Sequence, residues 1–113
     1  MKSGSYVPDR GDLVWLNFTP QTGHEQRGRR PALIFSPKIY NEKTSLCICL
    51  PITSKVKGYP FEVALPKGLD IEGVILSDQV KNLDFVAREV MHIGKVPHDV
   101  LVHVQKNVFA LVG

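Results

Sequence analysis

Apolar residues are grouped in short runs along most of the chain, and residues that favour turns separate these runs. The runs mix β-branched and aromatic residues with polar ones over the usual length of a strand. Residues 36–44 indicate an irregular or single-turn excursion between two of these runs. We predict strands over residues 12–18, 31–36, 46–53, 60–65, 73–80 and 85–96.

The pattern changes once, after Pro97, where apolar residues recur at spacings of three and four. This spacing predicts an amphipathic helix that buries a stripe formed by Leu101, Val104, Val108 and Leu111. Proline suits the first turn of a helix, because an N–H at that position has no partner within the helix. Many short strands followed by one helix predict a mainly β fold, either a small, strongly bent β-barrel or a two-sheet sandwich.

Composition indicates one globular domain over residues 1–113, because 43% of the residues are hydrophobic and only 22% are charged. No run approaches the ~20 apolar residues of a membrane helix, and the first residues lack the apolar core of a signal peptide. We therefore expect a cytoplasmic protein. Cys47 and Cys49 lie two apart in an expected strand, where geometry disfavours a bridge, so we expect reduced core thiols. The net charge of +3 permits a polyanionic partner without requiring one.

Positive charge is concentrated just before the second expected strand, in the segment HEQRGRRP (24–31). Arg27, Arg29 and Arg30 lie close to one carboxylate, that of Glu25. Because the proline that follows biases Arg30 towards extended geometry, this arginine is expected to be held at the strand start. Guanidinium groups bind phosphate in bidentate fashion. The segment therefore indicates either a solvated hairpin tip or an anion site, with Glu25 as a base or as an ion-pair partner.

A second group of polar residues lies where the expected strand 46–53 ends. Thr53 and Ser54 place two hydroxyls there, outside any sequence context typical of a covalent nucleophile. These hydroxyls could hydrogen-bond a phosphate or form a turn. Lys55 and Lys57 precede a Gly-Tyr-Pro turn, which favours either contact with single-stranded nucleic acid or a solvated basic turn.

Neither a metal site nor a cofactor site is indicated by the sequence. The four histidines show no metal-ligand spacing, and the chain has no glycine-rich phosphate loop and no zinc motif. We therefore expect no metal and no cofactor. His24 differs from the other histidines because it lies in the arginine segment and could exchange protons near neutral pH.

Several motifs follow one another along almost the whole chain. They are a Gly-Asp step before the first strand, P-x-x-G-x-E-Q-x-G-x-R-P ending at residue 31, P-x-T at 51–53, KGYPFEV and SDQVK. With these motifs the chain resembles the MazF/PemK family of toxin–antitoxin endoribonucleases, and it is most similar to the MazF branch. The combination is much more specific than any single motif.

The resemblance implies a small SH3-like β-barrel with a C-terminal helix, assembled as a homodimer. It also implies metal-independent cleavage of single-stranded RNA, in which the ribose 2′-hydroxyl attacks phosphorus and leaves 2′,3′-cyclic phosphate and 5′-hydroxyl ends. The family's catalytic arginine falls on Arg30, its catalytic threonine on Thr53, and its loop Glu-Gln on Glu25 and Gln26. Glu25 and His24 are alternative general bases. The substrate-binding candidates are Gln26, Arg27, Arg29, Ser54, Lys57 and Gln79.

Three functions are compatible with these residues. The first is an endoribonuclease toxin, with a cognate antitoxin whose acidic, disordered tail would cover the basic groove. The second is a gyrase-poisoning toxin of the same barrel fold, which would cut no nucleic acid. The third is an RNA-binding barrel without catalysis. The R-P and P-x-T steps favour the first, because the resemblance connects them with RNA cleavage.

Overall fold

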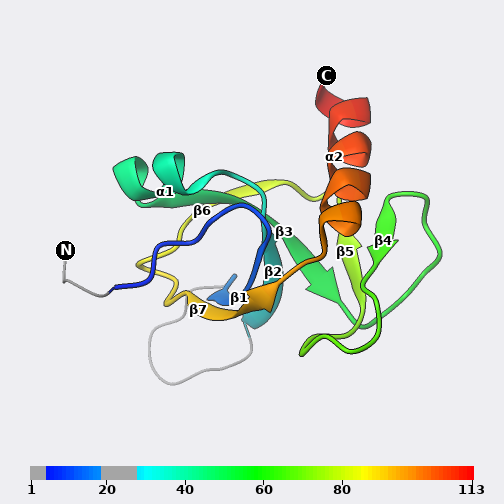
Figure 1. The fold of residues 1–113 in the computed structure, drawn as a ribbon, viewed down its shortest axis with the longest axis horizontal. Helices are drawn as coiled ribbons and strands as arrows, with labels where there is room; N and C mark the ends of the chain where they lie inside the picture. The colour runs from blue at the N-terminus through cyan, green and yellow to red at the C-terminus, as the bar shows by residue number, and fades with distance from the viewer. Residues whose placement is uncertain (1–4, 19–27) are drawn as a thin grey trace.

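The structure is a computed structural model that describes residues 5–18 and 28–113. In this part of the chain it is mainly β-sheet, with a short helix and a longer C-terminal helix (Figure 1). The strands are β1 (Asp12–Asn17), β2 (Arg29–Ile34), β3 (Leu46–Thr53), β4 (Glu62–Ala64), β5 (Val74–Leu76), β6 (Lys81–Asp84) and β7 (Met91–Lys95). The helices are α1 (Lys38–Thr44) and α2 (His98–Val112).

Strand β3 is the centre of the sheet. One of its edges pairs with β2, while the other pairs with β6 near the start of β3 and with β5 at its end. The strand order is β4-β5-β3-β2-β1-β7, and the pairings are antiparallel. Figure 1 shows α2 beside β4 and β5, with α1 at the other end of the sheet. The predicted mainly β fold with a C-terminal helix is confirmed.

Helix α1 replaces the irregular or single-turn excursion that we expected over residues 36–44, so that expectation was too short. Two contacts with the N-terminal segment explain the helix. The backbone N–H of Lys38 donates to the Asp9 carboxylate at 2.9 Å, which satisfies a donor at the helix start. The buried Asn41 side chain donates to the Pro8 carbonyl at 2.8 Å. Neither contact is visible in the local sequence pattern.

The expected strand over residues 85–96 is shorter in the structure, where only β7 is extended. Asp84 causes the difference, because its carboxylate accepts the backbone N–H groups of Val86 and Ala87 at 3.0 and 2.9 Å. The chain turns there, and Glu89 adopts a left-handed φ of 55° before β7 begins. The turn also leaves β6, which the sequence did not predict, paired with the first half of β3.

Both faces of the central strands are buried. Side chains alternate along a strand, so Leu13 and Leu33 join one core cluster while Val14 and Ala32 join the other. The first cluster includes the buried face of α2 through Val104. Because each face has its own core, a slip of one residue in strand register would exchange the two sets of side chains.

The two cysteines lie in the second core cluster, on the face away from α2. Cys47 and Cys49 are fully buried and are not bridged, so the prediction of core thiols is confirmed. The hydrogen bond with Cys47, together with burial, raises the pKa of Cys49, which keeps this thiol protonated at neutral pH.

The buried stripe of α2 differs by part of a turn from the predicted one. Val100, Val104 and Val108 are buried, whereas Leu101 is only half-buried and Leu111 is 48% exposed. Leu101 still packs against the core cluster beside α2, so the predicted stripe was wrong only at Leu111. A spacing of four keeps the three valines on the face that packs on the sheet, and Leu111 lies in the last turn.

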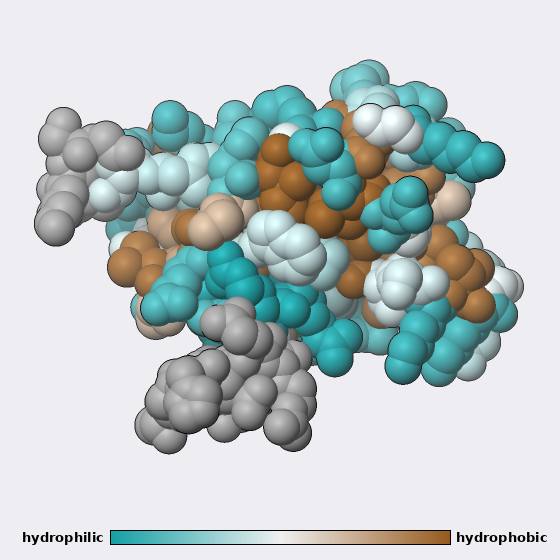
Figure 2. All heavy atoms as spheres, turned by 90° about the horizontal axis from the view of Figure 1, so that it is seen from below, coloured by the Kyte–Doolittle hydropathy of each residue, from teal (hydrophilic) through white to brown (hydrophobic). Residues whose placement is uncertain are grey.

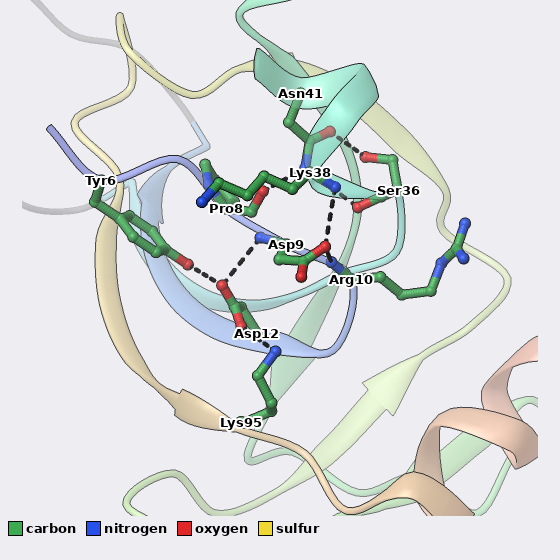
Figure 3. Close-up of polar contacts among 9 residues, drawn as sticks. All are labelled: Tyr6, Pro8, Asp9, Arg10, Asp12, Ser36, Lys38, Asn41 and Lys95. Atoms are coloured by element: carbon green, nitrogen blue, oxygen red, sulfur yellow. Dashed lines mark hydrogen bonds and ion pairs between the residues drawn. The ribbon is translucent and has the colours of Figure 1, made fainter.

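Asp12 connects the N-terminal segment, β1 and β7 (Figure 3). Asp12 is buried, and its carboxylate accepts from the Tyr6 hydroxyl at 2.5 Å and from the Asp9 backbone N–H at 3.0 Å. The Lys95 ammonium lies 2.8 Å from the second oxygen. Burial raises the pKa of Asp12, but the bonds from Lys95, Tyr6 and Asp9 outweigh it, so the pKa lies below its usual value.

Gly73 allows β5 to approach the end of β3. Its φ of 130° is unfavourable for residues with a side chain, and a Cβ placed there would lie 2.2 Å from the Thr53 carbonyl oxygen. Gly68 also has a positive φ, of 96°, but a Cβ there would meet nothing within 4 Å. A side chain at Gly68 would therefore cause backbone strain alone, whereas a side chain at Gly73 would cause backbone strain and a direct clash.

The first prediction concerns Asp12→Asn and pH. A carboxylate with a lowered folded pKa stabilises the fold above its unfolded pKa near 3.8, and this contribution is lost as pH falls through the folded value. We expect the variant to be less stable by roughly 1–3 kcal/mol at pH 7. The difference should shrink below pH 4. Urea unfolding at pH 7 and pH 3 measures it, and an equal difference at both values would contradict the prediction.

The second prediction compares Gly73→Ala with Gly68→Ala. At Gly68 we expect only backbone strain, a loss of roughly 1–2 kcal/mol in the free energy of unfolding. At Gly73 the clash with the Thr53 carbonyl adds to this strain, so the loss should be larger. Urea midpoints of the two variants decide the matter. Equal losses would show that β5 can move away from β3 at little cost.

Candidate active site

Arg30 and Thr53 meet across the β2–β3 pair. The register places Ala32 opposite Pro51 and Leu33 opposite Leu50. Continued by two residues, this antiparallel register places Arg30, the second residue of β2, opposite Thr53, the last residue of β3. The sequence motifs at these two positions are therefore brought together by strand pairing.

A hollow that we call the basic hollow lies on one side of this pair. Its volume is about 480 Å³, and Arg30 and Thr53 line it together with Phe18, Gln79, Lys81, Arg88 and apolar residues of β3, β5 and β6. Among the described residues of its lining, three are positively charged and none is negatively charged. The basic hollow is thus suited to an anionic ligand with an apolar or aromatic part.

A second hollow, which we call the mixed hollow, shares Arg30 and Thr53 with the first. Its volume is about 570 Å³, and its other polar lining residues are Ser54, Lys55, Asp70 and Glu72. Trp15 and Ile71 contribute apolar surface. Arg30 and Thr53 therefore stand where two hollows of different charge meet.

The Thr53 hydroxyl takes part in a turn at the end of β3. Its oxygen accepts the backbone N–H of Lys55 at 3.1 Å, which is the turn-forming role considered for this residue. A hydroxyl has a second lone pair and one hydrogen, so the same group can also donate to an anion. The turn holds the hydroxyl at the junction of the two hollows.

Two arginines hold the end of β1, Arg29 from the start of β2 and Arg88 from the turn before β7. Arg29 Nη1 donates to Asn17 Oδ1 at 3.4 Å and to the Glu89 carbonyl at 3.3 Å. Arg88 Nη1 donates to the carbonyls of Asn17 and Phe18 at 3.1 and 2.8 Å. We call Arg29 and Arg88 the arginine brace. Arg29 directly precedes Arg30 in β2, and its bond to the Glu89 carbonyl ties the start of β2 to the turn before β7.

The substrate-binding candidates differ in where they lie. Ser54 lines the mixed hollow and Gln79 lines the basic hollow. Arg29 lines neither and belongs to the arginine brace. Lys57 also lines neither hollow. Its backbone N–H donates to the Glu62 carboxylate, and its side-chain ammonium lies 6.0 Å from the Tyr59 ring centroid. The candidates that lie outside the described residues are His24, Glu25, Gln26 and Arg27.

Sequence reasoning missed four charged residues of the hollows. Lys81 lies in the SDQVK motif, which was a signal that could have been followed. Arg88, Asp70 and Glu72 carry no local signal, because each is an ordinary charged residue in a polar stretch. Only the tertiary structure brings them to Arg30 and Thr53.

Neither a cluster of potential metal ligands nor a membrane-spanning helix occurs in the described residues. No group of three or more histidine, cysteine or acidic side chains between residues 5 and 18 or between 28 and 113 could hold a metal ion. In the same part of the chain, neither helix has the length and apolar character needed to cross a membrane.

Comparison with known proteins gives closely related sequences. The chain is 46% identical over 108 residues to the Endoribonuclease toxin MazF of Escherichia coli strain K12, covering 96% of each chain. It is 33% identical over 97 residues to the Endoribonuclease PemK of Escherichia coli, covering 82% of this chain and 73% of PemK. Both relatives are named for cleavage of RNA.

A solved structure has the same fold and a similar sequence. The crystal structure of MazF (Form-I) from Deinococcus radiodurans superimposes with a TM-score of 0.88 at 52% identity, covering 96% of this chain and 99% of that one. The profile of the family described as PemK-like, MazF-like toxin of type II toxin-antitoxin system matches residues 9–112. The chain therefore belongs to this toxin family.

Proposed function

We propose that the chain is an endoribonuclease, the toxin of a type II toxin–antitoxin system, and that it cleaves single-stranded RNA without a metal ion. The observation that carries this proposal is the pairing of Arg30 with Thr53 at the junction of two hollows. It occurs in a chain 46% identical to an endoribonuclease toxin. The activity would inhibit translation and growth by destroying messenger RNA.

In this mechanism the scissile phosphate lies between Arg30 and Thr53. Attack by the neighbouring 2′-hydroxyl places additional negative charge on the phosphorus oxygens. Arg30, held by the backbone of β2, stabilises that charge through a bidentate contact with the two non-bridging oxygens, and the Thr53 hydroxyl donates to one of them. The bond from phosphorus to the 5′-oxygen then breaks, and this oxygen takes a proton from Arg30 or from water. The products are a 2′,3′-cyclic phosphate and a 5′-hydroxyl. Glu25 or His24 would accept the proton of the 2′-hydroxyl.

The remaining substrate-binding candidates act around this phosphate. Ser54 and Gln79 are proposed to bind RNA from the two hollows that they line. Arg29 contributes through the arginine brace as well as through its charge. Gln26, Arg27 and Lys57 are proposed to follow the phosphates that flank the cut.

The proposal extends to architecture and partners. The paired strands are proposed to form a small SH3-like β-barrel, with residues 1–113 as one domain. Exposed apolar side chains at the end of α2, such as Phe109 and Val112, support a homodimer. Figure 2 shows apolar side chains gathered beside hydrophilic ones on one face of the molecule.

An acidic antitoxin like the MazE of the Deinococcus radiodurans MazE-MazF complex would compete with RNA for the basic surface.

The third prediction tests Arg30. With long single-stranded RNA in the presence of EDTA, the wild type should give discrete fragments that end in 2′,3′-cyclic phosphate. Arg30→Ala should lower the cleavage rate roughly 10²–10³-fold, because it removes a donor aimed at the developing charge. Arg30→Lys keeps the charge without the planar fork and should restore only part of the rate. Lys43→Ala removes one charge from α1, outside both hollows, and should have no effect.

A measurement of RNA affinity shows whether Arg30→Ala affects cleavage itself or only the binding of RNA. Arg30→Ala should still bind RNA whose 2′-hydroxyls are methylated, because the other basic residues are intact. A parallel loss of binding and cleavage would favour a simple RNA-binding barrel. Intact RNA with the wild type, over varied sequences, would contradict the proposed function and favour the gyrase-poisoning alternative.

The fourth prediction concerns Thr53→Val, which keeps the shape of the side chain but removes the hydroxyl. We expect a loss of cleavage rate of roughly tenfold to a hundredfold, the usual value of a hydrogen bond to a charged group. The turn at Lys55 loses one bond, so unfolding should be followed in parallel. A full cleavage rate in a folded variant would remove Thr53 from the mechanism.

A further inference from the structure

The two hollows that meet at Arg30 and Thr53 have a similar plan. Each contains one aromatic residue from the β1 segment, Phe18 in the basic hollow and Trp15 in the mixed hollow. Aromatic rings are platforms on which RNA bases stack when a strand is held open. The volumes of about 480 and 570 Å³ exceed that of one base. The hollows are therefore placed to receive the two nucleotides that flank a phosphate held between them.

The hollows differ in their hydrogen-bond acceptors. The charged residues of the basic hollow, Arg30, Lys81 and Arg88, are all donors. The mixed hollow combines the donors Arg30 and Lys55 with two carboxylates, those of Asp70 and Glu72. An ionised carboxylate can only accept hydrogen bonds, and it repels a phosphate. The part of the mixed hollow that these carboxylates line therefore suits the donor edge of a base better than the RNA backbone.

The two carboxylates are carried by a segment that is fixed relative to Thr53. Ile71, between them, is 8% exposed and belongs to the core cluster beside α2. Gly73, directly after them, lies against the Thr53 carbonyl, and its own carbonyl accepts the Leu65 N–H at 3.0 Å. A solvated surface loop would need neither an anchored core residue nor a close backbone approach. The backbone that carries the two exposed carboxylates is thus held at a constant place beside Thr53.

We propose that the mixed hollow binds a nucleobase with an exocyclic amino group, next to the scissile phosphate, and that Asp70 and Glu72 are the residues that select it. Adenine, cytosine and guanine present amino hydrogens that a carboxylate can accept. Uracil presents one N–H between two carbonyl oxygens, which the carboxylates repel. This inference rests on the proposed function, because it assigns the substrate preference of the same site.

The experiment compares the wild type with the double variant Asp70→Asn, Glu72→Gln on a pool of randomised single-stranded RNA. Sequencing of the 5′-hydroxyl fragments gives the base after each cut, and sequencing of the fragments that end in 2′,3′-cyclic phosphate gives the base before it. In the wild type, one of them should strongly favour amino bases over uracil. In the double variant this ratio should fall about tenfold, because a side-chain amide can donate as well as accept. Glu42→Gln makes the same chemical change on α1 and should leave the ratio unchanged.

The outcomes are distinguishable. If the double variant cuts with the wild-type ratio at both positions, the inference is overturned while the proposed function stands. If the wild type cuts no RNA, both are overturned. If the double variant cuts too little to sequence, its affinities for 2′-O-methyl RNAs with adenine or uracil at the selected position give the same ratio. Discrimination between these two RNAs as strong as that of the wild type would again overturn the inference.

Discussion

The antiparallel register of β2 and β3 is the constraint on which the site depends. Arg30 and Thr53 are more than twenty positions apart in the chain, and only the pairing of their strands places them opposite each other. Leu33 and Ala32 face different core clusters, so a slip of one residue would bury the wrong side chains on both faces. The same hydrophobic burial that stabilises the sheet thereby sets the geometry of the proposed catalytic pair.

Strand ends tend to fray, so register alone does not hold them. Arg30 lies near the start of β2, and Thr53 is the last residue of β3. At the start of β2, Arg29 donates to Asn17 and Glu89, and Arg88 donates to Asn17 and Phe18 at the neighbouring end of β1. At the end of β3, pairing with β5 and the close approach of Gly73 hold Thr53. These contacts hold Arg30 and Thr53 in place. The proposed mechanism requires this, because a group that stabilises charge electrostatically must be positioned before the charge develops.

The local pattern was sufficient for β1 and β3, whose residue types favour strands, and for α2, whose spacing favours a helix. The family motifs pointed to Arg30 and Thr53, which remain the proposed catalytic pair. The local pattern was insufficient where tertiary contacts decide. β6 has the sequence KNLD and is a strand only because β3 offers a free edge, and α1 depends on Asp9 and Asn41 contacts with distant segments. The two carboxylates of the mixed hollow were missed for the same reason. Asp70 and Glu72 are ordinary loop carboxylates until Ile71 and Gly73 fix them beside Thr53.

This arrangement separates reaction from recognition. The proposed catalytic pair lies on β2 and β3, whose two buried faces leave little freedom for change. The groups that would read bases lie on the segment before β5 and on the stretch around β6, where exposed side chains can be exchanged without repacking a core. A sheet of this kind could therefore alter its RNA preference by substituting a few polar residues while the proposed phosphate chemistry stays the same. In the proposed mechanism, specificity is a property of the walls of the two hollows, and cleavage is a property of their junction.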